Sequence, residues 1–399
     1  MTDILKIDDQ STAEGRFSRF ELIGWWDQER LRSAHVLVIG AGAIGNELIK
    51  NFALLGIGQL FVADLDLIEN SNLSRSVLYR EADCGHSKAV IAATRAKDIF
   101  PEMATHAFHG NIVYDLGLGV YRWADVIIGG LDNREARVAV NQSAAKLGKP
   151  WIDGAIERLD GVARVFHPAT GPCYECTMSE LDWKMLEARR SCALLTREQM
   201  EQGKVPTTPT TSSVIAGIQA QEAVKMLHGM PTLSGEGYIF EGTHHQSYLV
   251  TYTRQEECPS HESFSQIDEL PWRASETRVG DLLDQARTDL GAKARIVLNQ
   301  DLLSGLICNR CQKTEGIWTS LGKVAESQGR CPACGEHRAP VLYHELSAET
   351  PWQDKTLFEL GIPAWDILSA YDGTASRHYE LSGDKASVLG PLHHVEVKS

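Results

Sequence analysis

The chain has 399 residues, of which 43% are hydrophobic and 23% are charged, and its formal net charge is −14. This length allows a large core spread over two or three domains, and the acidic balance argues against nucleic-acid binding by bulk electrostatics. The first ten residues are polar and acidic, and no apolar run approaches membrane-spanning length. We therefore expect no signal peptide, no membrane partner and a cytoplasmic location.

A glycine-rich turn follows the first strand-like run of the chain. Residues 35–39 are mostly β-branched, which is typical of a buried strand, and residues 46–55 read as a helix. The turn between them has G-x-G-x-x-G spacing, and its glycines are Gly40, Gly42 and Gly45. Backbone N–H groups at the N-terminus of the helix can hold an anionic phosphate.

A polar and cationic cluster follows the second strand. That strand, 60–63, ends at Asp64, whose carboxylate can accept hydrogen bonds from ribose hydroxyls. Beyond it come Asp66, Asn72, Arg75 and Lys88. A triphosphate needs such a cluster, whereas the nicotinamide pyrophosphate of an NAD-dependent oxidoreductase, the alternative from another class, does not. Asp132, after the apolar run 125–128, is a candidate Mg²⁺ ligand, because hard cations on triphosphates use carboxylates and phosphate oxygens.

Several of these motifs resemble one enzyme superfamily in their order and spacing. They are G-A-G-A-I-G, D-L-D followed by S-N-L-S-R, Lys88, and the L-D-N of Leu131, Asp132 and Asn133. Over roughly residues 12–262 the chain is similar to the ATP-dependent activating enzymes of ubiquitin-like proteins. This superfamily includes ubiquitin-activating enzymes and the ThiF- and MoeB-type adenylyltransferases of sulfur carriers. The resemblance implies a homodimer that binds ATP and Mg²⁺ through these motif residues.

An alternating β/α pattern predicts a Rossmann-like doubly wound sheet. The predicted helices are 87–99, 133–147 and 212–229, and the predicted strands 151–154 and 162–166. Arg137 and Asn141 sit four residues apart and hence on one helical face. The resemblance suggests that they shape the nucleotide pocket, and a structural polar contact is the alternative.

The N-terminal segment G-R-F-S-R-F carries two arginines. In relatives, an arginine from this segment crosses a dimer interface to the ATP phosphates of the partner subunit. Arg19 is the first candidate for this role and Arg16 the second, and a solvated surface arginine is the alternative. Such arginines change phosphoryl-transfer rates by about 10³–10⁵ elsewhere.

Nine cysteines include three C-x-x-C pairs, which in a cytoplasmic chain indicate zinc rather than disulfides. One set of possible ligands combines a C-x-x-C with a C-x-x-H, namely Cys173, Cys176, Cys258 and His261. Relatives carry cysteine pairs at both places, so the histidine is a departure that a Cys₃His zinc site accommodates. A second set has zinc-ribbon spacing and consists of Cys308, Cys311, Cys331 and Cys334. We expect Zn²⁺ at both sites; the alternatives are a degenerate first site that has lost its metal and a redox dithiol role for the second.

Cys192 lies outside every C-x-x-C pair and follows Arg189 and Arg190, whose charges favour its thiolate. In the family, the working cysteine falls between the first zinc half-site and the helix that 212–229 resembles. Cys192 is the candidate acceptor of the activated acyl group, and an unreactive loop cysteine is the alternative. Cys84, in a turn near the ATP motifs, reads as structural.

We expect a loose segment 1–15, an adenylation domain 16–264 with a mobile catalytic-cysteine segment 177–211, and a small α+β zinc-ribbon domain 265–399. The last occupies the position where conjugation-type relatives dock a conjugating enzyme. The resemblance thus implies bacterial conjugation-type activation: adenylation of the C-terminus of a ubiquitin-like protein, a thioester on Cys192, and transfer to a conjugating-type enzyme. The alternatives are activation of a sulfur carrier for thiocarboxylate formation, and a non-catalytic scaffold half of an activating enzyme.

Overall fold

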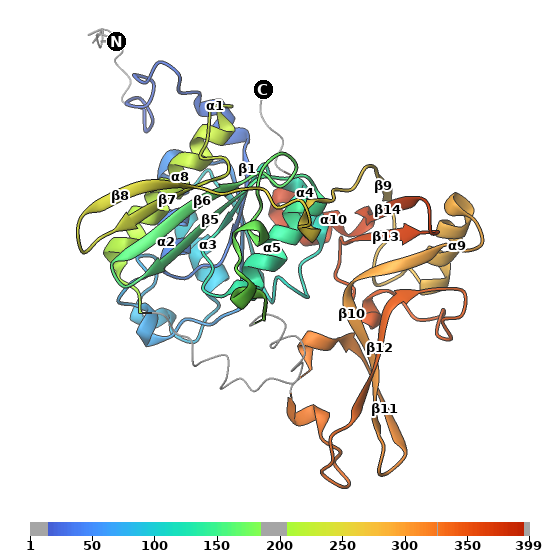
Figure 1. The fold of residues 1–399 in the computed structure, drawn as a ribbon. Coiled ribbons are helices and arrows are strands. Elements are labelled where there is room, and N and C mark those ends of the chain that lie inside the picture. Colours follow the sequence, from blue (N-terminus) through green and yellow to red (C-terminus); the bar gives the residue numbers. More distant parts are fainter. Residues whose placement is uncertain (1–14, 185–205, 325, 395–399) are drawn as a thin grey trace.

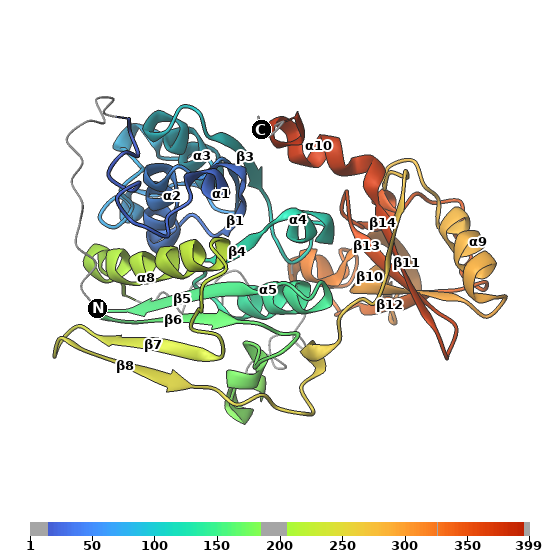
Figure 2. The ribbon, with the colours of Figure 1, turned by 90° about the horizontal axis from the view of Figure 1, so that it is seen from above.

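The computed structural model describes residues 15–184, 206–324 and 326–394. They hold two β-sheets (Figures 1 and 2). For description we call residues 15–264, with the first sheet, the N-terminal unit, and residues 265–394, with the second, the C-terminal unit. No helix within these ranges combines the length and the apolar character that a membrane span requires.

The N-terminal sheet has eight strands in the order β3-β2-β1-β4-β5-β6-β7-β8. Their bounds are β1 (His35–Ile39), β2 (Gln59–Asp64), β3 (Ala104–His109), β4 (Val126–Gly129), β5 (Trp151–Glu157), β6 (Asp160–Phe166), β7 (Glu236–Glu241) and β8 (Gln246–Thr251). Strands β1 to β5 pair in parallel, and β6 to β8 extend the sheet antiparallel. The β1, β2 and β4 side chains are almost all buried, as the β-branched runs predicted, because helices cover both faces.

Two groups of helices cover the two faces of this sheet. On one face lie α2 (Ala43–Leu55), α3 (Lys88–Ile99), α8 (Pro209–Leu227) and the short α1 (Gln28–Ser33), and on the other α4 (Leu118–Trp123) and α5 (Arg134–Lys146). The predicted helices are present, but α8 begins earlier than residue 212. Thr208 is its N-cap, and Pro209 fits the first turn because its missing N–H needs no partner there.

The C-terminal unit holds a six-stranded sheet and two helices. Its elements are β9 (Ile267–Leu270), α9 (Val279–Leu290), β10 (Arg295–Cys308), β11 (Lys313–Ser320), β12 (Ala339–Leu346), β13 (Ile367–Tyr371), β14 (Ser376–Leu381) and α10 (Lys385–Leu389). The far half of β10 pairs with both β11 and β12. These three strands form an arm that projects from the rest of the molecule (Figure 1).

Apolar contacts join the two units. Trp365 is 2% exposed and packs in the same core cluster as Tyr121 of α4. Gly119 is required beside it, because a Cβ there would lie 2.4 Å from the Trp365 ring. Leu389 and Leu392, at the end of the described chain, join this cluster, and the segment from α10 onward lies against β3 (Figure 2). This return segment covers an edge strand of the N-terminal sheet.

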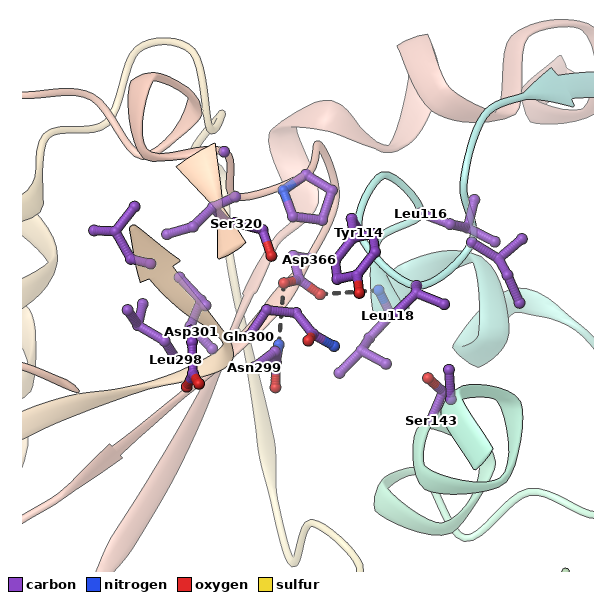
Figure 3. A pocket seen from close by; sticks show the side chains of 18 of the residues that line it. Tyr114, Leu116, Leu118, Ser143, Leu298, Asn299, Gln300, Asp301, Ser320 and Asp366 are labelled. Carbon is purple, nitrogen blue, oxygen red and sulfur yellow. Dashed lines mark hydrogen bonds between the residues drawn. The ribbon is translucent and has the colours of Figure 1, made fainter. Parts of the chain in front are cut away.

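Polar contacts cross the same junction. Lys146 donates to Asn299 Oδ1 at 2.7 Å, and Asn299 donates to Asp366 Oδ2 at 3.0 Å. The other Asp366 oxygen accepts the backbone N–H of Leu118 at 3.0 Å (Figure 3). Burial raises the pKa of Asp366, and these hydrogen bonds oppose the rise. The chain of bonds fixes α5 and α4 to the C-terminal sheet.

Candidate functional site

The glycine turn lies between the carboxyl end of β1 and the N-terminus of α2, where Gly42 is the N-cap. Gly40 has φ +89°, and a Cβ there would lie 2.6 Å from the Gly130 carbonyl oxygen. A Cβ on Gly45 would lie 1.9 Å from the Gly40 carbonyl oxygen. Only glycine permits both approaches, and no side chain caps the N-terminus of α2, which leaves its backbone N–H groups available to an anion.

Asp64 ends β2 beside this turn, as predicted. Its Oδ2 accepts the Ala41 N–H at 2.6 Å and its Oδ1 accepts the Asp66 N–H at 2.7 Å. Burial raises the pKa of Asp64, and the charge of Lys88 together with the two amide donors opposes the rise. The carboxylate is thus a preorganised acceptor at the carboxyl edge of the parallel strands, where open α/β sheets bind ligands.

Lys88 starts α3 and is 8% exposed. Its ammonium donates to Asp66 Oδ2 at 2.7 Å, so the two predicted residues form an ion pair next to Asp64. The Tyr79 hydroxyl lies 2.6 Å from the Ala41 carbonyl oxygen and 3.1 Å from that of Lys88. Tyr79, which sequence reasoning did not single out, therefore holds the start of α3 against the glycine turn.

The remaining predicted nucleotide ligands lie on two loops. Asn72 is 8% exposed, and its Oδ1 accepts the Glu69 N–H at 2.9 Å. Arg75 donates to the Ser71 carbonyl oxygen at 2.8 Å. Asp132 is exposed and accepts a hydrogen bond at 3.1 Å from Asn133, which caps α5. Leu131 precedes it on the loop after β4.

The two N-terminal arginines differ in their surroundings. Arg16 donates to the Ile99 carbonyl oxygen at 2.6 Å, and its guanidinium lies 5.5 Å from the centre of the Phe100 ring. Arg19 is exposed, and within residues 15–184, 206–324 and 326–394 no hydrogen bond or ion pair engages it. Arg16 is thus anchored to its own chain, whereas Arg19 is accessible to another molecule.

A buried ion cluster lies behind the carboxyl edge, and sequence reasoning missed it. Asp153 is fully buried and accepts hydrogen bonds from Arg137 Nε at 2.9 Å and Arg164 Nε at 3.1 Å. Burial raises the pKa of Asp153, but the two guanidinium groups outweigh it and hold this pKa below its usual range. The signal was an acid inside W-I-D-G and an arginine inside V-A-R-V-F, each interrupting an apolar run.

Arg137 also donates to the carbonyl oxygens of Leu131 and Gly154. It therefore supports the loop after β4 from beneath. Asn141, one turn further along α5, instead donates to Glu175 at 2.8 Å and accepts from the Tyr174 N–H at 2.9 Å. Its contact is structural, the alternative left open by the sequence.

The first predicted zinc set comes together. The ligand atoms of Cys173, Cys176, Cys258 and His261 lie within 4.8 Å of one another. Cys173 Sγ lies 3.8 Å from Cys176 Sγ and 3.5 Å from Cys258 Sγ. Zinc–sulfur bonds of about 2.3 Å in a tetrahedral site place sulfur atoms roughly 3.8 Å apart, so this set of three cysteines and one histidine fits Zn²⁺. Glu175 links the cluster to α5 through Asn141.

The second set lies at the tip of the arm. Cys308, Cys311, Cys331 and Cys334 also have their ligand atoms within 4.8 Å of one another. Cys308 Sγ lies 3.5 Å from Cys334 Sγ, and two short loops, after β10 and before β12, supply the two pairs. A four-thiolate donor set at these distances fits Zn²⁺ as well.

The two remaining cysteines belong to neither zinc set. Cys192, the candidate acyl acceptor, lies outside the described residues. Cys84 is exposed, in the turn before α3. A cavity of about 80 Å³ lies at the junction of the units, between α5 and residues 298–302 and 360–368. The half-buried Lys146 and the buried Asp366 in its lining are joined through Asn299, so we interpret the cavity as part of the junction between the units.

The sequence of the chain is similar to those of known enzymes. A sulfur carrier protein adenylyltransferase of Thermus thermophilus is 32% identical over 243 residues, covering 59% of this chain and 85% of that protein. The catalytic subunit of the NEDD8-activating enzyme E1 of Schizosaccharomyces pombe is 37% identical over 166 residues. That alignment covers 40% of this chain and only 37% of the yeast protein.

The fold has solved counterparts. The structure of Escherichia coli MccB with ATP matches with a TM-score of 0.53 and 22% identity, covering 63% of this chain and 75% of that one. A family model described as the ThiF family matches residues 15–260, more than half of the chain. The chain with this glycine turn, Asp64 and Lys88 at one sheet edge therefore belongs to the ThiF family.

Proposed function

We propose that the chain uses Mg·ATP to adenylate the C-terminal carboxylate of a ubiquitin-like or sulfur-carrier protein. The observation that carries this proposal is the meeting of the glycine turn, Asp64 and Lys88 at the carboxyl edge of the parallel strands. Family membership supports it, because the Thermus and yeast relatives are named as enzymes that act on such proteins.

The proposed reaction is a substitution at the α-phosphorus of ATP. An oxygen of the carrier's carboxylate forms a bond to this phosphorus, and the bond from the phosphorus to the bridging oxygen breaks. Pyrophosphate leaves with that electron pair, which gives an acyl-adenylate. The carboxylate is already ionised at neutral pH, so no strong base is needed, and positioning and charge neutralisation supply the rate.

The described residues have distinct parts in this reaction. The amides at the α2 N-terminus, Arg75 and Lys88 hold the phosphates, with Asn72 beside them. Asp64 holds the ribose, and Asp66 orients Lys88 through their ion pair. Asp132 holds Mg²⁺, which when bound neutralises phosphate charge.

Arg19 completes the site from the partner subunit of a homodimer in this proposal. Its exposure supports this role, and so do the exposed apolar side chains Leu22 and Trp25 on the same segment, which are 57% and 50% exposed. Mixing two inactive variants, Arg19→Ala and Asp132→Asn, tests it. If the arginine acts across the interface, each mixed dimer has one intact site, and activity returns to about a quarter of the wild-type value. No recovery after subunit exchange contradicts the role in trans.

A thioester is the proposed second step. The Cys192 thiolate attacks the acyl carbonyl, a C–S bond forms and AMP leaves. The support comes from sequence alone, in the neighbouring Arg189 and Arg190. In this conjugation function the acyl group passes to a conjugating-type enzyme, for which the arm of the C-terminal unit is the proposed docking element. Activation of a sulfur carrier is the second candidate, favoured by the name of the Thermus relative.

Intact mass measured without reductant distinguishes the two candidates. The protein is incubated with Mg·ATP and candidate carriers. A reductant-labile adduct that disappears in Cys192→Ala, but not in Cys84→Ala, supports thioester formation. Pyrophosphate exchange without any adduct supports activation of a sulfur carrier.

A further inference from the structure

The loop after β4 is held at three consecutive backbone groups. The Gly130 N–H donates to the Ile39 carbonyl oxygen at 2.9 Å, which continues the ladder of β1. Arg137 donates to the Leu131 carbonyl oxygen from α5. The Gly129 carbonyl oxygen accepts a hydrogen bond at 2.9 Å from the side-chain amide of Gln219, which comes from α8 on the opposite face of the sheet.

A glutamine is unusual at position 219, because the position is fully buried. Its side chain is 0% exposed, and its Oε1 has no hydrogen-bond donor among the residues that the structure describes. A buried acceptor without a donor costs free energy, and this cost offsets much of what the bond to Gly129 contributes to stability. Stability alone therefore does not explain the glutamine.

Strand β5 has a glycine where it contacts the Gln219 amide, and this glycine is a second cost in stability. Gly154 lies inside β5, and a Cβ on it would lie 2.3 Å from Gln219 Oε1. Glycine inside a strand weakens the strand, because it loses more conformational entropy and packs no side chain. Two local costs are thus tolerated around one hydrogen bond, and that bond ends on the Gly129 carbonyl group.

The bond between Gln219 and Gly129 holds the loop after β4, which lies at the edge of the proposed nucleotide site. Asp132 lies three residues beyond Gly129 and is exposed, with a hydrogen bond only from its neighbour Asn133 in the described residues. Its location therefore depends on the loop backbone. The same loop packs on the glycine turn, since the Gly130 carbonyl oxygen occupies the space beside Gly40 that a Cβ would need.

We propose that Gln219 is a positioning residue that holds the loop after β4, and with it Asp132, in the geometry that binds Mg·ATP. It acts through the Gly129 carbonyl group and does not touch the nucleotide. The inference rests on the proposed function, because it takes Asp132 as the Mg²⁺ ligand.

The test is the Mg²⁺ concentration that gives half-maximal ATP binding, measured by titration of the full chain. In Gln219→Met we expect this concentration to rise about fivefold, the equivalent of one hydrogen bond of about 1 kcal/mol. The melting temperature changes little, because the substitution removes the unpaired Oε1 but takes the donor away from the Gly129 carbonyl group. Ile215→Val, a small change in the buried face of the same helix, is the control and leaves the Mg²⁺ requirement at the wild-type value.

Gln219→Glu adds a pH signature that a purely structural role does not produce. The protonated carboxyl can donate to the Gly129 carbonyl oxygen, but the ionised one cannot, and burial raises the pKa of such a group. Relative to wild type at each pH, its Mg²⁺ requirement is near normal at about pH 6 and rises toward about pH 9. Unchanged Mg²⁺ requirements in both variants overturn the inference. Absence of Mg²⁺-dependent ATP binding in wild type instead contradicts the proposed function.

Discussion

Asp153→Asn is the sharpest test of how the carboxyl edge of the sheet is stabilised. The substitution keeps the side-chain shape but removes the negative charge between Arg137 and Arg164, whose side chains are 9% and 13% exposed. The asparagine amide also turns a donor toward a guanidinium group that is itself a donor. Removing one partner of a buried ion pair costs about 3–5 kcal/mol, and we expect the free energy of unfolding to fall by this amount.

Urea unfolding at pH 7, followed by tryptophan fluorescence, measures the loss. Asp98→Asn is the matched control, because Asp98 makes an exposed ion pair with Arg95 at 3.2 Å and such pairs contribute at most about 1 kcal/mol. If Asp153→Asn lowers the free energy of unfolding by no more than the control does, the buried ion cluster does not stabilise the fold as proposed.

The difference in unfolding free energy between wild type and Asp153→Asn also depends on pH, in a direction that the Asp153 pKa fixes. The pKa of Asp153 is lowered in the folded state, so its contribution is complete above the unfolded-state pKa of about 3.9. It is lost as the pH falls through the folded-state pKa. The stability difference between wild type and Asp153→Asn is therefore constant near neutrality and shrinks below about pH 4. A difference that grows on acidification contradicts the assignment.

Three further predictions concern other parts of the molecule. We expect metal analysis of the purified chain to give two zinc ions, one for each cluster. Cys334→Ser removes one ion, whereas Cys84→Ser, which lies outside both clusters, removes none. Equal zinc contents in the two variants would falsify the zinc site that includes Cys334. Arg122 of α4 forms an ion pair with the buried Glu380 of β14. Arg122→Gln removes this cation, so amide hydrogen exchange in β14 accelerates, and unchanged exchange there argues against a stabilising role of the ion pair. Lys88→Gln weakens ATP binding at least tenfold by titration, because it removes a charge next to the phosphates; undiminished affinity places the phosphates elsewhere.

The parallel half of the N-terminal sheet was predictable because its signals are local. A buried parallel strand is a continuous apolar run, and a G-x-G-x-x-G turn marks the strand-to-helix passage directly. The zinc donor sets were predictable for the same reason, since paired ligands follow fixed spacings. The structure brings both sets together, while metal binding itself stays a prediction.

The C-terminal sheet was much harder to predict, because its pairings are long-range and its strands are half exposed. Strand β9 pairs in parallel with β14 across more than 100 residues, and β10 bends through a bulge that lets it pair with three strands. Asp153 was missed because its two cations come from α5 and β6, and neither is adjacent in sequence. Gln219 was not singled out from the sequence, because a lone glutamine within a helix carries no signal, and only its contact with Gly129 sets it apart.

Carrier-dependent exchange of labelled pyrophosphate into ATP tests the central claim most directly. The chain is assayed with Mg·ATP and a panel of ubiquitin-like and sulfur-carrier proteins, each supplied with a free C-terminal carboxylate and with the same terminus amidated. We expect exchange with at least one free-carboxylate carrier, none with its amide, and loss of exchange in Asp132→Asn. Exchange that persists with the amidated carrier, or a chain that binds NAD far better than ATP and exchanges with none, contradicts it.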